Sequence, residues 1–422
     1  MTGGGALGRR FAWLWAAYAA SAYGSGLGFG ALPLIAVLVV HAGPAEVSAL
    51  SAAGPAVGAL IALPLAPWVE FRRKRRVMIA TDLVRCAAMA SIPVAHAFGR
   101  LGFVQLLVVS AVVAAAKIAF NAASGAFLKA LVRPEDLLVA NARFESTNWS
   151  ALAIGPPLGG AAIGLFGPVA TVLADAAGYL LSALGIAAIG GREDAPRPAG
   201  GGRIRAGAVL DGWRHLLGDP ALRALYLDNL LVSGLIMATQ PLLTVLLLGR
   251  LGFTPWQYGL AFAAPCLGGL IGSRLAPRVV ARHGRHRVLR VVGTLRAVWL
   301  IGLAFVRPGT AGLVTVIAVE LAIIVNMSLY NPVLAAHRLE RTPRRLVART
   351  LAAWSIGQQA AVAVLTALGG LLAGAIGPRA AIAVAGALVL AGPLLRPRRG
   401  ERAPRGGERA PRGGAEPSPG RS

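Results

Sequence analysis

Long apolar blocks separated by short polar loops fill the chain from residue 11 to residue 395. Most blocks match the roughly 20 residues that an α-helix needs to cross the hydrocarbon core of a membrane. The blocks are continuous and rich in Ala and Leu, which favours helices over the alternating strands of a membrane barrel. The pattern predicts twelve membrane-spanning helices, at residues 11–40, 47–69, 77–98, 102–128, 146–166, 168–189, 224–248, 256–275, 288–306, 310–336, 350–375 and 378–395.

The second half of the chain repeats the first. The segment Ser25 to Val40 (SGLGFGALPLIAVLVV) returns as Ser233 to Leu248 (SGLIMATQPLLTVLLL), at an offset of 208 residues. Residues 53–67 return as residues 263–277 at an offset of 210. An order-preserving duplication in an apolar chain is typical of transporters built from two similar bundles with the substrate between them. We therefore expect an all-α polytopic membrane protein with two parallel six-helix repeats.

The 422 residues include 42 Lys and Arg and carry a net charge of +25, which in a soluble protein suggests a nucleic-acid partner. Here the position of the charges explains them better, since the dense basic clusters fall in loops on one side of the predicted spans. By the positive-inside rule both termini are cytoplasmic, and we expect a multi-pass protein of the inner or plasma membrane. The basic residues in the opposite loops are Arg100, Arg250, Arg307 and Arg379.

Composition divides the chain into four parts. Residues 1–189 form the first bundle and residues 224–395 the second. Between them, residues 190–223 read as a cytoplasmic linker whose end, Ala208–Leu217, has the spacing of an amphipathic surface helix. Residues 396–422 are polar and rich in Pro, Gly and Arg, so we expect a disordered basic tail with weak attraction to anionic lipid.

Three local strings carry a resemblance to a known family: RRVMIATDLVR (Arg75 to Arg85), PEDLLVANARFES (Pro134 to Ser146) and GPPLGG (Gly155 to Gly160). Together with the twelve spans and the basic loop between spans two and three, they resemble the major facilitator superfamily, and within it the enterobactin-exporter and macrolide-efflux branch. The resemblance implies the major facilitator fold, a small-molecule substrate, no cofactor and function as a monomer.

In that superfamily, the loop between spans two and three latches one bundle to the other by charge pairs. Phe71 stands here where the family has Arg, so the resemblance at this loop is partial. The residues that correspond to the gating loop are Glu70, Arg72, Arg73, Arg75 and Arg76.

The string in span five resembles the antiporter motif of the superfamily. Two prolines lack N–H donors and bend a helix, and glycines let a neighbouring helix approach closely. A general small-residue packing face is the alternative. The motif residues are Gly155, Pro156, Pro157, Gly159 and Gly160.

Charged residues inside spans are costly and are therefore candidates for function. Glu320, near the middle of span ten, is our first choice for a proton carrier, with hydrogen bonding between helices as the alternative. Lys117 in span four is a second candidate, whose alternatives are an anionic substrate or a structural ion pair. Asp175 and Asp228 are weaker candidates for proton coupling. The charges that we assign to the structure are Asp82, Arg85 and Arg296.

The resemblance places the substrate between spans one, four, seven and ten. Aromatic rings and uncharged hydrogen-bonding groups around an apolar space suit a bulky amphipathic solute. The candidate substrate contacts are Tyr18, Tyr23, Ser25, Asn121, Gln240, Asn326, Tyr330 and Asn331.

Together these features predict a secondary transporter that exports a drug, siderophore or secondary metabolite in exchange for protons by alternating access. An uptake carrier for a small metabolite and a non-transporting receptor or scaffold of the same fold are the alternatives. No nucleotide-binding loop and no metal-ligand or catalytic cluster is visible in the sequence, so we expect neither an enzyme nor a metal site.

Overall fold

The computed structural model describes residues 8–28, 30–70, 72–133, 136–190, 206–343 and 346–391. Most of the predicted linker before residue 206 and the whole predicted tail at 396–422 lie outside the described residues, as does the side chain of Glu70.

In the first repeat the first predicted span is broken into two helices. Gly30 has φ 72°, a left-handed conformation that glycine adopts without strain, and it separates the two pieces. The helices of this repeat are α1 (Gly8–Leu27), α2 (Ala31–Leu38), α3 (Pro44–Glu70), α4 (Lys74–Ala97), α5 (Phe103–Leu131), α6 (Leu137–Phe166) and α7 (Pro168–Ala187).

The second repeat follows the amphipathic helix α8 (Ala206–Gly218), which begins close to the predicted position. Its helices are α9 (Pro220–Thr244), extended by the π-helix η2 (Val245–Arg250), α10 (Pro255–Ala263), α11 (Cys266–His283), α12 (Arg285–Val298), extended by the 3₁₀-helix η3 (Trp299–Phe305), α13 (Thr310–Glu340), α14 (Val347–Ile376) and α15 (Pro378–Ala391).

The prediction of an all-α polytopic membrane protein is confirmed. Among the described residues, 10 helices are long and apolar enough to cross a membrane, and a helix pair covering α10 and α11, bent by 48°, would be an eleventh. The apolar helix at Pro378–Leu390 is shorter, so the count of twelve spans stays a prediction at its last member.

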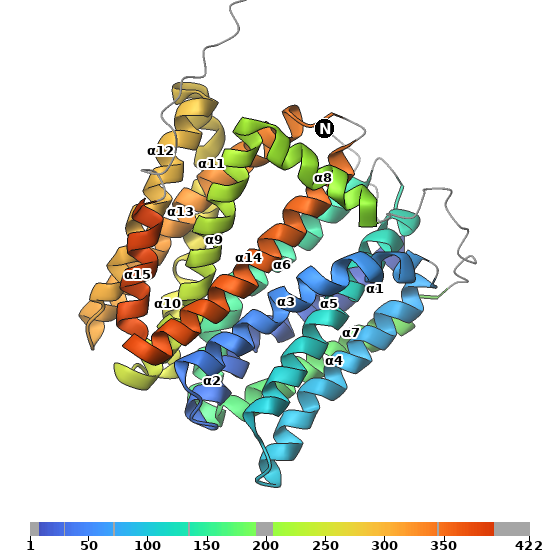
Figure 1. Cartoon of the computed structure of the whole chain (residues 1–422). Coiled ribbons are helices and arrows are strands. Elements are labelled where there is room, and N and C mark those ends of the chain that lie inside the picture. The colour runs from blue at the N-terminus through green and yellow to red at the C-terminus, as the bar shows by residue number, and fades with distance from the viewer. Residues whose placement is uncertain are drawn as a thin grey trace, which may run out of the picture.

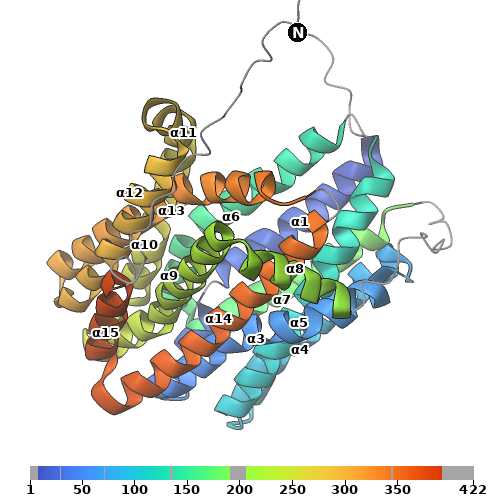
Figure 2. The ribbon, with the colours of Figure 1, turned by 45° about the horizontal axis from the view of Figure 1, so that its top comes forward.

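The two repeats occupy opposite sides of the molecule in Figure 1, with α3 and α14 packed side by side between them. A second contact between the repeats joins α6 to α10. The helix α8 lies at the top of Figure 1, and the loop from α4 to α5 lies at the bottom. Figure 2, turned by 45°, shows α8 crossing α14, which it contacts where α14 begins. We call the end of the molecule at which α8 lies the terminal end, and the end at which the loop from α4 to α5 lies the loop end.

Candidate functional site

Within the described residues, each repeat holds one buried arginine stacked on an aromatic ring. Arg85 of α4 forms an ion pair with Asp82 one turn earlier, and both side chains are buried. Its guanidinium lies 4.6 Å from the ring centroid of Phe120 in α5 and 4.4 Å from that of Tyr179 in α7. The arginine thus joins three helices of the first repeat by contacts that neutralise its charge.

Arg296 is the counterpart in the second repeat. It lies on α12, 2.8 Å from the Asp228 carboxylate and 3.4 Å from the side-chain oxygen of Asn229, both on α9. Its guanidinium is 3.9 Å from the ring of Tyr330, which occupies the repeat position of Phe120. Arginine and aromatic ring are therefore duplicated, but the acid comes from a different helix position in each half.

This geometry bears on two expectations. Asp228 is engaged by Arg296 in the structure, and its part in proton coupling stays a prediction. Tyr330 was expected to contact substrate, but its side chain is fully buried beneath Arg296 and does not line an open space in this structure. Its contact with substrate stays a prediction.

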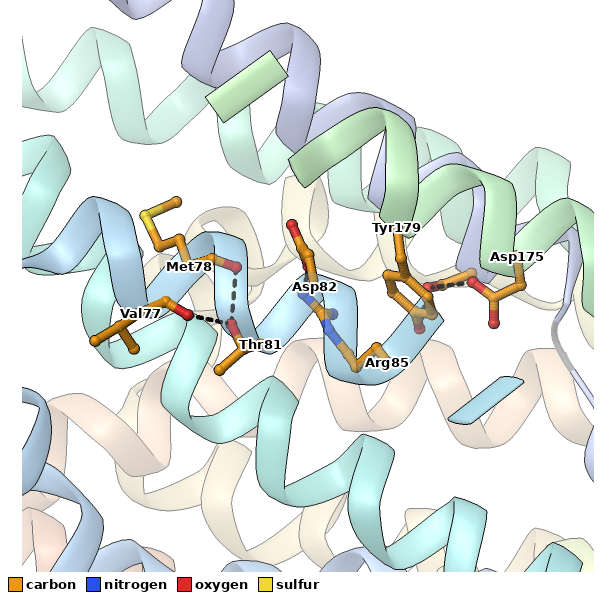
Figure 3. Close-up of polar contacts among 8 residues, drawn as sticks. Val77, Met78, Thr81, Asp82, Arg85, Asp175 and Tyr179 are labelled. Carbon is orange, nitrogen blue, oxygen red and sulfur yellow. Dashed lines mark hydrogen bonds and ion pairs between the residues drawn. The ribbon is translucent and has the colours of Figure 1, made fainter. Parts of the chain in front are cut away.

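Asp175 of α7 is bonded to a hydroxyl where α1 ends. Ser25 Oγ donates to Asp175 Oδ1 at 3.1 Å, and the Tyr179 hydroxyl lies 2.9 Å from Ser25 Oγ. Figure 3 shows Asp175, Tyr179, Arg85 and Asp82 following one another along the adjoining faces of α7 and α4. The structure thus brings together a predicted coupling residue and a predicted substrate contact in one partly buried chain of polar groups.

Glu320 lies at 4% exposure in the middle of α13. Gln240 Nε2 of α9 donates to its carboxylate at 3.1 Å. Among the described residues no cation forms an ion pair with it, unlike the carboxylates of Asp82 and Asp228. Glu320 is therefore a buried carboxyl group whose hydrogen-bond partner is an amide, and Gln240, a predicted substrate contact, is that partner.

The remaining predicted substrate contacts are spread over the two repeats. Tyr23 is bonded to Ser150 at 2.8 Å, and the ring of Tyr18 lies 4.4 Å from that of Phe144. Asn326 donates to a carbonyl of its own helix at 2.8 Å. Of the candidates for substrate contact and proton coupling, those that are exposed are Tyr23, Lys117, Asn121 and Asn331.

The antiporter-like motif of α6 lies between α1 and α10. A Cβ atom added at Gly155 would lie 2.5 Å from the backbone of Gly26, at the end of α1. One added at Gly160 would lie 2.6 Å from the carbonyl oxygen of Pro255 in α10, and one at Gly259 would lie 2.5 Å from that of Pro156. Glycine is therefore required for these helices to approach, and the motif sits where one repeat meets the other near the loop end.

The basic loop holds its own repeat together in this structure. Arg75 donates to the carbonyl oxygens of Ile186, at 3.1 Å, and Ala187, at the last turn of α7, where a cation is favoured by the helix dipole. Arg72, Arg73 and Arg76 lie in the same loop or at the start of α4, on the terminal end. The predicted latch to the other repeat stays a prediction.

The second repeat is tied at the terminal end by pairs at helix ends. Asp219 caps α9 by accepting from the backbone N–H of Ala221 at 2.9 Å and Leu222 at 3.3 Å, and it accepts from Arg341 at 3.0 Å. Burial alone would raise the pKa of Asp219, but these two N–H groups and the Arg341 guanidinium together lower it below its usual value. Arg349 of α14 pairs with Asp211 of α8 at 3.0 Å.

One polar group that sequence reasoning missed is Asn229. Its amide donates to Gln358 of α14 at 3.2 Å, and its oxygen accepts from Ser233 at 3.3 Å. The signal was present as a run of polar residues, Asp228, Asn229 and Ser233, on one face of an otherwise apolar span.

Comparison with known proteins gives consistent results. The family model of the Major Facilitator Superfamily matches residues 14–336. The chain is 30% identical over 301 residues to the multidrug efflux pump Tap of Mycobacterium tuberculosis (strain ATCC 25618 / H37Rv), covering 67% of this chain and 68% of that one. The Tap pump of Mycolicibacterium fortuitum is 26% identical over 307 residues, covering 69% and 73%.

Solved structures share the fold. The nucleoside transporter NupG superimposes with a TM-score of 0.72 at 10% identity, covering 92% of this chain and 98% of that one. A bacterial homologue of the iron transporter ferroportin gives 0.71 in its inward-facing state, at 16% identity over 91% of this chain and 98% of that one. The outward-facing state with soaked iron gives 0.57, at 18% identity over 91% and 97%.

Proposed function

The chain belongs to the major facilitator superfamily, and from that premise we propose that it exports bulky amphipathic small molecules across the cell membrane in exchange for protons. The chain is a multi-pass membrane transporter of this family. The direction of transport, the proton as coupling ion, the substrate class and the cytoplasmic location of both termini are parts of the proposal.

The observation that carries the coupling is the environment of Glu320. An ionised carboxylate in the middle of a membrane is costly unless a cation faces it. Glu320 is buried against the amide of Gln240, and no cation pairs with it within the described residues. Such a group is stable when it holds a proton and needs water access to release it, which a carrier that opens alternately to each side supplies.

Asp175 is the corresponding group of the first repeat. Its carboxylate is bonded to the Ser25 hydroxyl, beside the break between α1 and α2. A Cβ atom added at Gly28 would lie 3.1 Å from the Asp175 side chain, so the break and the carboxylate are packed together. A change in the charge of Asp175 would therefore be felt directly by span one.

The packing of the repeats supports alternating access. The close approaches of α6 to α10 and of α14 to α3, where Gly370 meets Ser48, lie toward the loop end. With the terminal end in the cytoplasm, as the basic loops favour, this is the arrangement closed to the outside. The higher TM-score against an inward-facing neighbour agrees with this assignment.

Export is favoured over uptake by the relatives, since the Tap proteins are described as multidrug efflux pumps. The exposed amide side chains of Asn121 and Asn331 stand at the same repeat position of α5 and α13. Hydrogen-bonding groups at equivalent positions of two otherwise apolar helices suit an amphipathic solute.

Export from cells that express the protein tests this function. The probes are the amphipathic fluorophores anilinonaphthalene sulfonate, phenylnaphthylamine and ethidium, which are anionic, neutral and cationic. We expect energised cells to retain less of at least one probe than cells without the protein, and a protonophore to remove the difference. Glu320→Gln should abolish the gradient-dependent part, whereas Glu340→Gln, at the exposed end of the same helix, should not.

Two results would count against the proposal. Export that continues unchanged after the proton gradient has collapsed would remove the coupling. Accumulation of probe in place of depletion would favour the uptake carrier.

A further inference from the structure

Lys117 differs from the other charges in the middle of the spans. It lies at the centre of α5 and is exposed, whereas Arg85, Arg296, Asp175 and Glu320 are buried. Within the described part of the chain it makes no hydrogen bond and no ion pair. An ammonium group has three donors and no acceptor, so at this depth it needs an acceptor from outside the fold.

The exposed residues of α5 fall on two faces. Val104, Val108 and Ala122 lie along one side, as expected for a surface in contact with lipid. Lys117 and Asn121, four residues apart, share a second face, turned by roughly 140° from Ala122 at about 100° per residue. The ammonium group therefore does not simply extend from the lipid-facing side of the helix.

The second face of α5 runs toward the other repeat. In the half of α5 nearer the loop end, α3 covers this face. Ser110 Oγ donates to the Leu50 carbonyl at 3.3 Å, and the Ala114 side chain would lie 3.8 Å from a Cβ atom added at Gly54. From Lys117 toward the terminal end, Lys117 and Asn121 on this face are exposed. Since α3 is the helix that packs on α14 of the second repeat, this stripe lies on the inter-repeat side of the bundle.

No ion pair is formed with Lys117 within the described residues. Arg85 and Asp175 act on it electrostatically, but Arg85 is paired with Asp82, and the Asp175 carboxylate is hydrogen-bonded to the Ser25 hydroxyl and not to the ammonium group. At the same position of the second repeat stands Met327, which is half-buried and packs on the apolar core. The duplicated fold thus provides a cation on one side and an apolar group on the other.

We propose that Lys117 binds an anionic group, a carboxylate or a sulfonate, of an amphipathic molecule that the transporter carries, with the Asn121 amide as a neighbouring donor. This assignment rests on the proposed export function and narrows its substrate class. The arrangement selects molecules that join one anionic group to an apolar body, because the ammonium group supplies the charge and the second repeat supplies apolar surface.

A matched pair of fluorophores tests this assignment. Anilinonaphthalene sulfonate and phenylnaphthylamine share one ring system and differ by the sulfonate. Binding of each is measured by fluorescence on the full chain in lipid nanodiscs, with empty nanodiscs subtracted. We expect the wild type to bind the sulfonate more tightly, and Lys117→Met to weaken sulfonate binding about tenfold while leaving binding of the neutral probe unchanged.

Two further variants separate a specific site from a change in net charge. Lys117→Arg keeps the cation and should keep the preference for the sulfonate. Lys129→Met removes an exposed lysine near the end of the same helix and should change neither affinity. Retained binding of the neutral probe shows that each variant is folded.

Three outcomes would overturn the assignment: unchanged sulfonate affinity in Lys117→Met, equal loss of both probes in that variant, or no preference for the sulfonate in the wild type. The binding measurement uses no gradient, so its failure leaves proton-coupled export standing. Conversely, export that does not depend on the proton gradient, together with retained selectivity for the sulfonate, would refute proton coupling and still support the anion site at Lys117.

Discussion

Gly160 lets the backbone of α6 lie directly against the backbone of α10. Replacing it with alanine should destabilise the state in which the two repeats are in contact at the loop end. The added Cβ would lie 2.6 Å from the Pro255 carbonyl oxygen and 3.3 Å from the Gly259 Cα atom. Ordinary contacts begin at 3.4 Å. The helices α6 and α10 would therefore have to separate by about 0.8 Å, and backbone atoms cannot rotate out of the way as a side chain can.

The size of the effect follows from the cost of overpacking, about 1–3 kcal/mol. Alanine also raises helix stability by up to about 1 kcal/mol relative to glycine. Since α6 is a helix whether the loop end is closed or open, that gain does not alter the ratio of the closed to the open state. The population of the state closed at the loop end should fall relative to others by about 5- to 150-fold. Gly164→Ala, one turn along α6 with nothing within 4 Å of its Cβ position, is the matched control.

Spin-label distances across the loop end measure this equilibrium. Labels at Phe98→Cys and Phe305→Cys, one in each repeat and both largely exposed, report on its opening once Cys86 and Cys266 are replaced by serine. We expect Gly160→Ala to shift the distance distribution toward longer values and Gly164→Ala to leave it unchanged. Identical distributions in the two variants would refute the role given to this contact.

Two further perturbations address the second repeat. Asp228→Ala leaves Arg296 buried without its carboxylate partner and should lower the unfolding free energy by about 3–5 kcal/mol. Asp211→Ala removes an exposed ion pair and should lower it by no more than about 1 kcal/mol. Unfolding in detergent compares the two variants, and similar losses would contradict the structural role of the buried pair. Asp219→Asn keeps the helix cap and removes the charge. Because the folded pKa of Asp219 is lowered, its charge stabilises the protein above the unfolded value of about 3.9 and ceases to do so as the pH falls through the folded value. The variant should therefore melt below the wild type at pH near 7, and the difference should shrink as the pH falls below about 3.9. A difference that stays constant on acidification would exclude this origin.

Hydropathy was sufficient to place the spans because a membrane helix must satisfy its backbone internally and present apolar side chains to lipid. The same rule hid the break in span one, since Gly28 and Gly30 sit within a continuous apolar run and a broken helix has the same hydropathy as an intact one. The duplication indicated that Arg85 and Arg296 are parts of the frame, and their equivalent stacking on Phe120 and Tyr330 agrees with it.

Partners far apart in sequence could not be predicted. Gln240 and Glu320 are 80 residues apart, and Ser25 and Asp175 are 150 apart. Hydropathy gives the depth of each residue but not the rotation of its helix, and rotation decides which groups meet. For the same reason the sequence did not indicate that Tyr330 packs beneath Arg296.

Proton movement in sealed liposomes tests the exchange most directly. Vesicles carrying the purified protein and the pH-sensitive dye pyranine are given a gradient of a probe that cells export, and internal pH is recorded as the probe moves. We expect protons to move opposite to the probe through the wild type and Glu340→Gln, and Glu320→Gln to move probe without protons. Probe flux through the wild type with no change in pH, or an unaltered proton flux in Glu320→Gln, would contradict proton exchange at Glu320.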